Sequence, residues 1–575
     1  MTPPLVLEDA VKTVTADQDK ILSPVQTLAH VRKKLEAVGM DILSETRRID
    51  SGRLDIPVFF SVCGTDAKQL TGTSKQMGKG ASPEQAEASA VMELMERFSV
   101  YAFKTTPAHF TTATWEDVKK QAIPLDQIAA SVNESTEETD QVAPFFSALP
   151  FNWTPATNLT RNQIVLVPFD WFFMINAFNG ASAGNCREEA LCQGICEVVE
   201  RHVCARVAKE RLTLPGIDLE TVTDPVTKTL IEKFTRNGIR LYASDMTLDT
   251  GIPTVSVLAY DPATFPEKSE LVWTAGTAPS PVKALNRALT EVAQLGGDFN
   301  SGTTYEASGL PKYTSLASAD DIMNPAEIKS IDSLPDISDI NIRVEVERLI
   351  DRLRKIGFEI LTIETTHPEL NIPAFYTLIP GTAFRERAEM SSMGLFTAKY
   401  MAENLPPVKA KQLLEQFETA MPGRYYTCFY QGMVELAMED IPAAADAFRE
   451  ALGRSPSAQD MPSICSYLGM CLKDMEEYDK ALEILNQGLS MDAERTDILN
   501  LIGFCHFKRD AFEKAIHAFE QVIALNPSSG IDYANMATNY RKLGQTQKAI
   551  AYYEKAVAID PTLEFAWENL LKLKS

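Results

Sequence analysis

Two stretches of the chain repeat one arrangement of acidic and basic side chains. In both, a polar residue is followed four positions later by Glu, and a second Glu with an adjoining Arg follows three positions after that. The two sets are Ser89, Glu93, Glu96 and Arg97, and Gln193, Glu197, Glu200 and Arg201. Residues three or four positions apart share one face of an α-helix. Each stretch therefore predicts a helix with one acidic face.

Carboxylates crowded on such faces repel one another unless a cation lies between them. Hard oxygen ligands select Mg²⁺ or Mn²⁺, and Mg²⁺ commonly bridges to substrate phosphates. With arginines beside them, the acidic faces predict a site for a nucleoside triphosphate bound through its metal ions. The alternative is a pair of solvated helices with surface Glu-Arg pairs, because both residues favour helices. The duplication of the pattern favours the metal and nucleotide site.

The segments before the two acidic helices carry helix-start signals. Ser82 is a candidate N-cap of the first helix, and Gln85 completes a capping box. The Gly-Lys-Gly turn at residues 78–80 can approach an anion, although a simple turn is the alternative. Before the second helix, residues 180–184 are mostly small and let the backbone approach a ligand, and Asn185 is a candidate cap. Further on, Arg287 and Glu291 share the face of a third predicted helix.

This combination resembles the YcaO family, whose ATP site is built from paired Ser/Gln-x3-Glu-x2-Glu-Arg helices and a later Arg-x3-Glu helix. The match is close over residues 78–103, 182–203 and 284–294. The resemblance implies that Mg²⁺ ions are held by Glu93, Glu96, Glu197 and Glu200. It further implies that ATP is bound by Lys20, Ser89, Arg97, Ser182, Asn185, Glu189, Gln193, Arg201, Arg287 and Glu291.

The family chemistry implied by the resemblance is activation of a peptide-backbone amide by ATP. The amide oxygen is phosphorylated and phosphate later leaves, which yields azoline rings, thioamides or amidines. Many azoline-forming members end in a proline-rich tail, whereas this chain ends in Leu571-Lys572-Leu573-Lys574-Ser575. This difference favours the branch similar to an accessory factor for methylthiolation of a ribosomal protein.

Composition narrows the class of protein. The net charge is −23, from 55 basic and 78 acidic residues, which argues against direct binding to nucleic acid. No window has the roughly 18 apolar residues that a membrane span requires. We therefore expect a cytoplasmic protein with no membrane partner. Nine cysteines include the cluster Cys186, Cys192, Cys196 and Cys204, for which small buried side chains are favoured over a soft-metal site.

Two domains are predicted from the hydrophobic patterns. Residues 58–62, 255–260 and 358–363 have the β-branched and aromatic composition of strands. Mixed with the acidic helices, they predict an α+β catalytic domain over residues 1–405, with irregular stretches at 135–155 and 300–340. A connecting segment, residues 406–423, follows.

Residues 424–575 repeat a helical pattern. Gly432, Gly469, Gly503 and Ala537 recur at spacings of 37, 34 and 34 residues, and each is followed twelve residues later by Ala. This period resembles that of tetratricopeptide repeats and predicts an all-α domain that contacts a protein, either a substrate or partner or a second copy in a homodimer.

The leading functional hypothesis is an ATP- and Mg²⁺-dependent enzyme of YcaO type that modifies a peptide or protein backbone, with the repeats recruiting the substrate or a partner. One alternative is a non-enzymatic scaffold that binds ATP, and another is an adaptor in which only the repeats act. A ligase similar to glutamine synthetase also holds metals through carboxylates, but the duplicated Glu-Arg spacing fits YcaO better.

Overall fold

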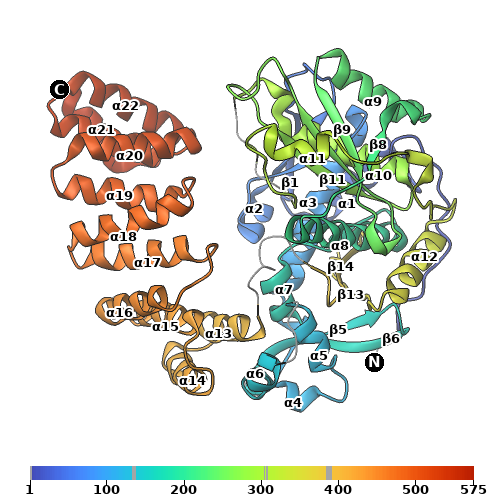
Figure 1. Cartoon of the computed structure of the whole chain (residues 1–575), viewed down its shortest axis with the longest axis horizontal. Coiled ribbons are helices and arrows are strands. Elements are labelled where there is room, and N and C mark those ends of the chain that lie inside the picture. The colour runs from blue at the N-terminus through green and yellow to red at the C-terminus, as the bar shows by residue number, and fades with distance from the viewer. Residues whose placement is uncertain (1–2, 133–136, 303–304, 306–308, 384–391) are drawn as a thin grey trace. The chain divides into compact units, whose positions relative to one another are not determined.

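The chain forms two compact units, residues 1–393 and 394–575, each described by itself here (Figure 1). The computed structural model describes residues 3–132, 137–302, 305, 309–383 and 392–575. In this described part, no helix is long and apolar enough to cross a membrane.

A three-stranded antiparallel sheet lies against the first acidic helix. It consists of β1 (Leu43–Arg48), β2 (Val58–Cys63) and β3 (Lys75–Lys79), in that order. Helix α3 (Pro83–Thr105) packs on all three strands. The approach is close at Gly78, where an added Cβ atom would lie 2.0 Å from the backbone nitrogen of Ala90. The glycine in the Gly-Lys-Gly segment is therefore required by helix packing.

A five-stranded sheet is covered on its two faces by different helices. Its order is β11 (Val272–Thr277), β10 (Thr254–Tyr260), β9 (Arg240–Asp245), β8 (Gly216–Asp218) and β12 (Ile328–Ser330). Helix α10 (Pro281–Gly296) shares one hydrophobic core with this sheet, and helix α8 (Arg187–Glu210) shares the other. Because β10 and β11 are covered on both sides, nearly all of their side chains are buried.

A six-stranded sheet lies on the other side of α8 (Figure 1). It contains β4 (Thr111–Ala113), β5 (Phe151–Asn158), β13 (Leu361–Glu364), β14 (Ala374–Leu378) and β7 (Ala181–Ala183), and β6 (Gln163–Pro168) pairs with β5. Both α3 and α8 contact β7 and β14. The two acidic helices are thus packed among sheets.

The remaining helices of this unit are α1 (Pro24–Val38), α2 (Thr65–Thr71), α4 (Trp115–Val118), α5 (Leu125–Ala130), α6 (Glu137–Ala148), α7 (Phe169–Asn176), α9 (Pro225–Arg236), α11 (Asp320–Met323) and α12 (Ile342–Lys355).

The predicted α+β class is confirmed, since the described strand pairs are antiparallel except β8 with β12. Strands β2 and β10 occupy the predicted residues, and β13 begins at Leu361, later than predicted. The prediction of an irregular stretch at residues 135–155 is wrong, because α6 and the start of β5 lie there. Val142 and Phe146 of α6 are fully buried, so core packing outweighs the polar composition and an internal proline. Residues 300–340 contain only short elements, and 303–304 and 306–308 lie outside the described residues.

The second unit is a series of helix pairs. Helices α13 (Met393–Asn404) and α14 (Pro407–Ala420) come first, so most of the expected connecting segment is helical and belongs with the repeats. The pairs are α15 (Tyr425–Ala437) with α16 (Ile441–Gly453), α17 (Met461–Asp474) with α18 (Tyr478–Met491), α19 (Thr496–Lys508) with α20 (Phe512–Leu525), and α21 (Gly530–Lys542) with α22 (Thr546–Ile559), followed by α23 (Glu564–Lys574).

The recurring glycines mark the closest contacts within these pairs. An added Cβ atom on Gly432, Gly469 or Gly503 would lie 2.6, 2.4 or 2.6 Å from the side chain sixteen residues later, which is Phe448, Leu485 or Phe519. A large side chain on one helix therefore fills the space that the glycine leaves on its partner. This packing explains why a glycine recurs at the same place in these three pairs.

The Gly503 contact predicts a specific loss of stability. Gly503→Leu should lower the free energy of unfolding of the repeat unit by about 1–3 kcal/mol, because the new side chain overlaps the Phe519 ring. Gly453→Leu is the matched control, since Gly453 has no neighbour within 4 Å of an added Cβ atom. Thermal and denaturant unfolding of the full chain measure both changes. Equal stability of the two variants would contradict the packing account.

Candidate active site

A cavity of about 380 Å³ opens where α3, α8 and α10 meet the N-terminal segment. It gathers residues that are far apart in the sequence. The predicted site residues that line it are Lys20, Ser89, Glu93, Glu96, Arg97, Asn185, Glu189, Gln193, Glu197, Glu200, Arg201, Arg287 and Glu291. The acidic faces of the two helices thus face one shared cavity.

Each acidic helix supplies its own arginine to its carboxylates. Arg97 lies 3.4 Å from Glu93 and 3.0 Å from Glu96, while Arg201 lies 4.0 Å from Glu197 and 3.8 Å from Glu200. The Arg97 guanidinium also lies 4.3 Å from the centroid of the Phe178 ring. Two cations offset only part of the charge of four carboxylates.

Burial shifts the pKa values of all four carboxylates in one direction. Burial raises the pKa of Glu96 well above its usual range, and the Glu197 and Glu93 carboxylates add to this effect against the opposing Arg97 charge. Burial likewise raises the pKa values of Glu93, Glu197 and Glu200, although their neighbouring arginines oppose the shift. A divalent cation between the helices would stabilise the ionised carboxylates.

Strand β11 and helix α10 complete the other side of the cavity. The backbone N–H of Thr277 donates to Glu200 Oε2 at 2.9 Å, which fixes that carboxylate. Arg287 Nη1 donates to Gln193 Oε1 at 2.8 Å and joins α10 to α8. Among the residues that the structure describes, its buried Nε atom has no hydrogen-bond partner.

Lys79 is a cavity residue that the sequence analysis did not assign. Its ammonium pairs with Glu291 of α10, and both side chains line the cavity. The only local signal was a lysine between two glycines, read as a turn. Other polar residues that line the cavity but lie outside the sequence motif are Gln18, Thr27, Gln85, Thr290 and Gln294.

Glu189 is a buried acceptor that ties three segments together. One carboxylate oxygen accepts from the Ile21 N–H at 2.6 Å, and the other accepts from the Asn185 N–H at 3.0 Å and from its side-chain amide at 2.9 Å. Lys20 Nζ lies 3.9 Å from the second oxygen. The structure therefore brings Lys20 to the cavity from the N-terminal segment.

Two local expectations need correction. Asn185 does not cap the second helix, because the N-cap of α8 is Cys186 and the Asn185 side chain bonds Glu189 instead. The capping box at the first helix is incomplete: Ser82 accepts from the Gln85 N–H at 3.2 Å, but the Gln85 side chain turns to the cavity.

Ser182 is the predicted nucleotide residue that does not line the cavity. It is fully buried in β7, behind α8. An added Cβ atom on Gly194 of α8 would lie 2.8 Å from its hydroxyl oxygen, so Ser182 marks where the helix presses on the sheet. Its hydroxyl has no hydrogen-bond partner in the described structure.

The cysteines near the site are free thiols. Burial raises the pKa of Cys186 to about 12, and a hydrogen bond that the Cys192 thiol makes to Cys196, together with burial, raises the pKa of Cys192. Within the described residues, no three His, Cys, Asp or Glu side chains converge closely enough to hold a metal ion by themselves. Ions between α3 and α8 would therefore need phosphate oxygens and waters to complete their shells, as Mg²⁺ commonly does.

Comparison with known proteins identifies the families that the chain matches. A family model described as YcaO cyclodehydratase, ATP- and Mg²⁺-binding, matches residues 77–383. Tetratricopeptide-repeat models match residues 463–495 and 532–563. The predicted repeats are therefore confirmed.

Individual relatives match parts of the chain. A protein of Methanothermobacter thermautotrophicus is 28% identical over 378 residues, which span 62% of this chain and 93% of that protein. The Escherichia coli ribosomal protein S12 methylthiotransferase accessory factor YcaO is 28% identical over 269 residues, 42% of this chain and 44% of that protein. A solved heterocyclase in complex with substrate and cofactor superimposes with a TM-score of 0.52 at 22% identity, over 66% of this chain and 55% of that one.

The Arg287 contact generates a prediction for nucleotide binding. Arg287→Ala should weaken binding of a non-hydrolysable ATP analogue with Mg²⁺ by about 1.5–3 kcal/mol, because a guanidinium hydrogen bond to phosphate is lost. Arg206→Ala is the control, since Arg206 lies on α8 but pairs with Glu210 and Asp249 outside the cavity. Titration calorimetry gives both affinities. A lower melting temperature with unchanged affinity would show that Arg287 is structural.

Proposed function

The chain belongs to the YcaO family, and we propose that it is an enzyme that uses ATP and Mg²⁺ to activate a backbone amide of a peptide or protein. The observation that carries the proposal is the meeting in one cavity of three arginines and four carboxylates, of which Glu200 is buried and the other three are half-buried. ATP and Mg²⁺ are the cofactors of the family, and the described site offers hard oxygen ligands and guanidinium groups that fit them.

The roles of the chain's own residues follow from their placement. Glu93 and Glu96 on α3 would hold Mg²⁺ together with Glu197 and Glu200 on α8. Bound ATP with its metals supplies the phosphoryl group that turns an amide oxygen into a leaving group. Arg97, Arg201 and Arg287 would bind phosphate oxygens and stabilise the negative charge of the transferring group.

The polar residues at the N-terminal end of α8 have a separate task. Glu189, Asn185 and Lys20 form one hydrogen-bonded and ion-paired group at the cavity wall. Such a rigid set of donors and acceptors is suited to orienting the nucleoside part of the ligand. We assign no proton-transfer residue.

A second candidate function is accessory. The E. coli relative is named as an accessory factor for methylthiolation of ribosomal protein S12, and this chain spans less than half of it. In that role the protein would bind ATP and assemble a modification enzyme with its substrate. Substrate-dependent release of phosphate by the purified chain would favour the enzyme, whereas nucleotide binding without turnover would favour the accessory factor.

The metal-binding role predicts the effect of neutral substitutions. Glu93→Gln and Glu197→Gln should each abolish Mg²⁺-dependent phosphate release while leaving the fold intact, because the amide binds a divalent cation poorly. Glu210→Gln, at the exposed end of α8, serves as the control. Phosphate assays and circular dichroism test this together. Wild-type release by both cavity variants would refute the metal assignment.

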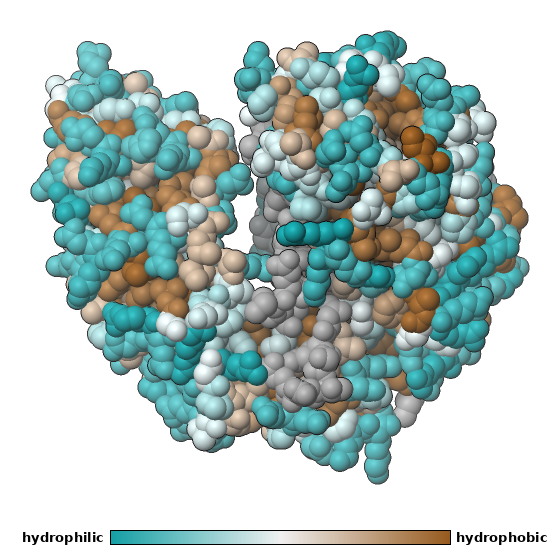
Figure 2. Space-filling model, viewed as in Figure 1, coloured by the Kyte–Doolittle hydropathy of each residue, from teal (hydrophilic) through white to brown (hydrophobic). Residues whose placement is uncertain are grey.

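The repeat unit offers a groove for the substrate or a partner. The groove has a volume of about 780 Å³ and is lined mainly by α17, α19 and α21. Figure 2 shows hydrophobic side chains gathered over the helices of this unit. Phe504 in the groove is 38% exposed, with Lys473 and Lys508 lying 5.2 and 5.5 Å from its ring centroid. Polar Asn500 and Asn535 can bond a peptide backbone beside this apolar surface.

Recruitment by the groove can be tested without truncating the chain. Phe504→Ala should reduce the recovery of the cellular partner by several-fold, because an exposed aromatic side chain commonly dominates a peptide contact. Trp567→Ala removes an equally exposed aromatic residue of α23 outside the groove. Quantitative co-purification compares the two variants with wild type. Equal recovery by all three proteins would assign recruitment to another surface.

A further inference from the structure

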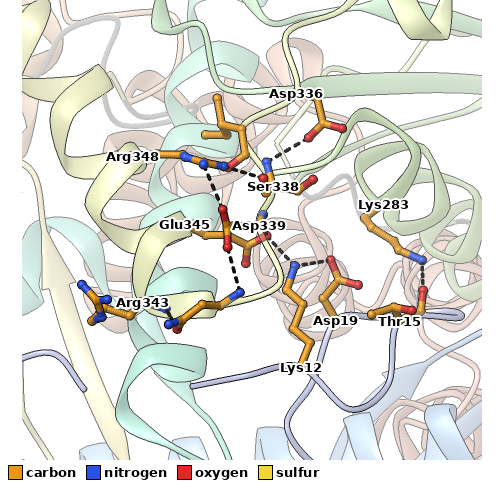
Figure 3. Close-up of polar contacts among 12 residues, drawn as sticks. Lys12, Thr15, Asp19, Lys283, Asp336, Ser338, Asp339, Arg343, Glu345 and Arg348 are labelled. Atoms are coloured by element: carbon orange, nitrogen blue, oxygen red, sulfur yellow. Dashed lines mark hydrogen bonds and ion pairs between the residues drawn. The ribbon is translucent and has the colours of Figure 1, made fainter. Parts of the chain in front are cut away.

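An N-terminal strap, defined here as residues 8–23, starts beside α12 (Figure 3) and reaches the nucleotide cavity at Gln18 and Lys20. The Ala10 N–H donates to Asn341 Oδ1 at 3.0 Å, and the Lys12 N–H donates to the Ile340 carbonyl oxygen at 2.9 Å. In return, the Ile342 N–H donates to the Ala10 carbonyl oxygen at 2.9 Å. The first half of the strap is thus bonded to the segment that begins α12.

The second half of the strap folds back on itself next to the cavity. Val14 and Lys20 exchange backbone hydrogen bonds of 3.1 and 3.0 Å, so that residues 15–19 form a closed loop. Lys283 of α10 donates to the carbonyl oxygens of Thr15 and Ala16, both at 2.6 Å. The loop therefore has a defined place against α10, and Gln18 and Lys20 face the cavity.

Lys12 connects the two halves from inside the protein. Its ammonium lies 2.8 Å from Asp19 in the loop and 2.5 Å from Glu345 in α12, and its side chain is only 3% exposed. Figure 3 shows this ammonium between the loop and the helix. Lys12 itself lines neither the nucleotide cavity nor the narrower cavity beside it.

The two carboxylates depend on this one cation. Burial raises the pKa of Glu345, and the hydrogen bond and charge of Lys12 oppose that effect. Glu345 also accepts a hydrogen bond from the Asp339 N–H at 3.1 Å. Because that donor is neutral, the negative charge of Glu345 is balanced by Lys12. Removing one partner of a buried ion pair leaves an uncompensated buried charge, which is strongly destabilising.

The loop is also the anchor for direct nucleotide contacts. Immediately after Lys20, the Ile21 N–H donates to Glu189 at 2.6 Å. On the opposite side, Asp17 accepts from the Ala81 N–H at 2.7 Å, just before α3. A shift of the loop would therefore move Lys20 and release Glu189 together.

We propose that Lys12 is a positioning residue for the nucleotide: its ion pairs with Asp19 and Glu345 hold the strap loop against the cavity, so that nucleotide affinity depends on a side chain that does not touch the nucleotide. This inference rests on the ATP-binding role of the cavity proposed above. It adds a determinant of affinity outside the acidic helices.

Substitution of Lys12 provides the first test. Titration calorimetry with Mg²⁺ and a non-hydrolysable ATP analogue should show Kd raised about tenfold or more in Lys12→Met, with most of the affinity restored in Lys12→Arg. If the chain turns over ATP, KM for ATP should rise while kcat at saturation stays near wild type. Arg343→Ala is the matched control, because Arg343 ties the same strap to α12 through Asp9 in an exposed pair and should change Kd less than twofold.

Hydrogen exchange on the unmodified chain provides the second test and does not depend on a variant that folds. Coupling between two sites is reciprocal, so a loop that strengthens nucleotide binding must itself be stabilised by the nucleotide. The backbone amides of Val14, Lys20 and Ile21 should exchange several-fold more slowly when Mg²⁺ and the analogue are bound.

The outcomes separate this inference from the proposed function. If the wild-type chain binds no nucleotide, the proposed function itself fails. If it binds nucleotide, and folded Lys12→Met binds with the wild-type Kd, the positioning role is overturned. A lowered melting temperature with unchanged Kd, or exchange rates of the loop amides that nucleotide does not alter, would likewise overturn it.

Discussion

The first unit is organised around negative charge held inside the protein. Four carboxylates from α3 and α8 share one cavity, where burial penalises their ionised forms. An arrangement of this kind costs stability unless cations compensate for it. The chain supplies part of the compensation through Arg97 and Arg201, each within one helical turn of its own acids. In the proposed function, divalent metal ions balance the remainder and carry the phosphates.

Close packing on the other faces of these helices allows the acids to meet. Gly78 of β3 lets the strand press on α3, and Gly194 lets α8 press on Ser182 of β7 and Thr377 of β14. Because the apolar faces of α3 and α8 are buried in these contacts, their acidic faces are the ones that line the cavity. Helix α10, packed on β10 and β11, then closes the third side through Arg287.

Charge also organises the edge of the site. The buried cation Lys12 holds the strap at the cavity. One of its acidic partners, Asp19, lies in the strap loop, and the other, Glu345, lies in a helix more than three hundred residues away in the sequence. Ion pairs of this kind contribute little net stability compared with apolar contacts, but they specify geometry. In a nucleotide site, the geometry of Lys20 and Glu189 is what matters. The repeat unit, by contrast, is built on steric complementarity between glycines and large side chains.

The sequence by itself determined the features that depend on local periodicity. The spacing of Glu93, Glu96 and Arg97 defines one helix face whatever the helix packs against, and the 34-residue recurrence of Gly469 and Gly503 defines a repeated helix pair. These patterns predicted the α+β class, the family and the repeats, all of which are confirmed. The resemblance to the family implied a residue set of which all but Ser182 lines one cavity.

Only the tertiary structure decided the contacts between distant segments. The pairing of Lys79 with Glu291, the bond of Asn185 to Glu189 in place of a helix cap, and the burial of Ser182 depend on which elements meet in space. The helix at 137–148 formed for the same reason, because burial of its apolar side chains in the core outweighs its polar composition. Local sequence reports the preference of a segment, whereas the free energy of long-range packing selects the partner that each side chain finally contacts.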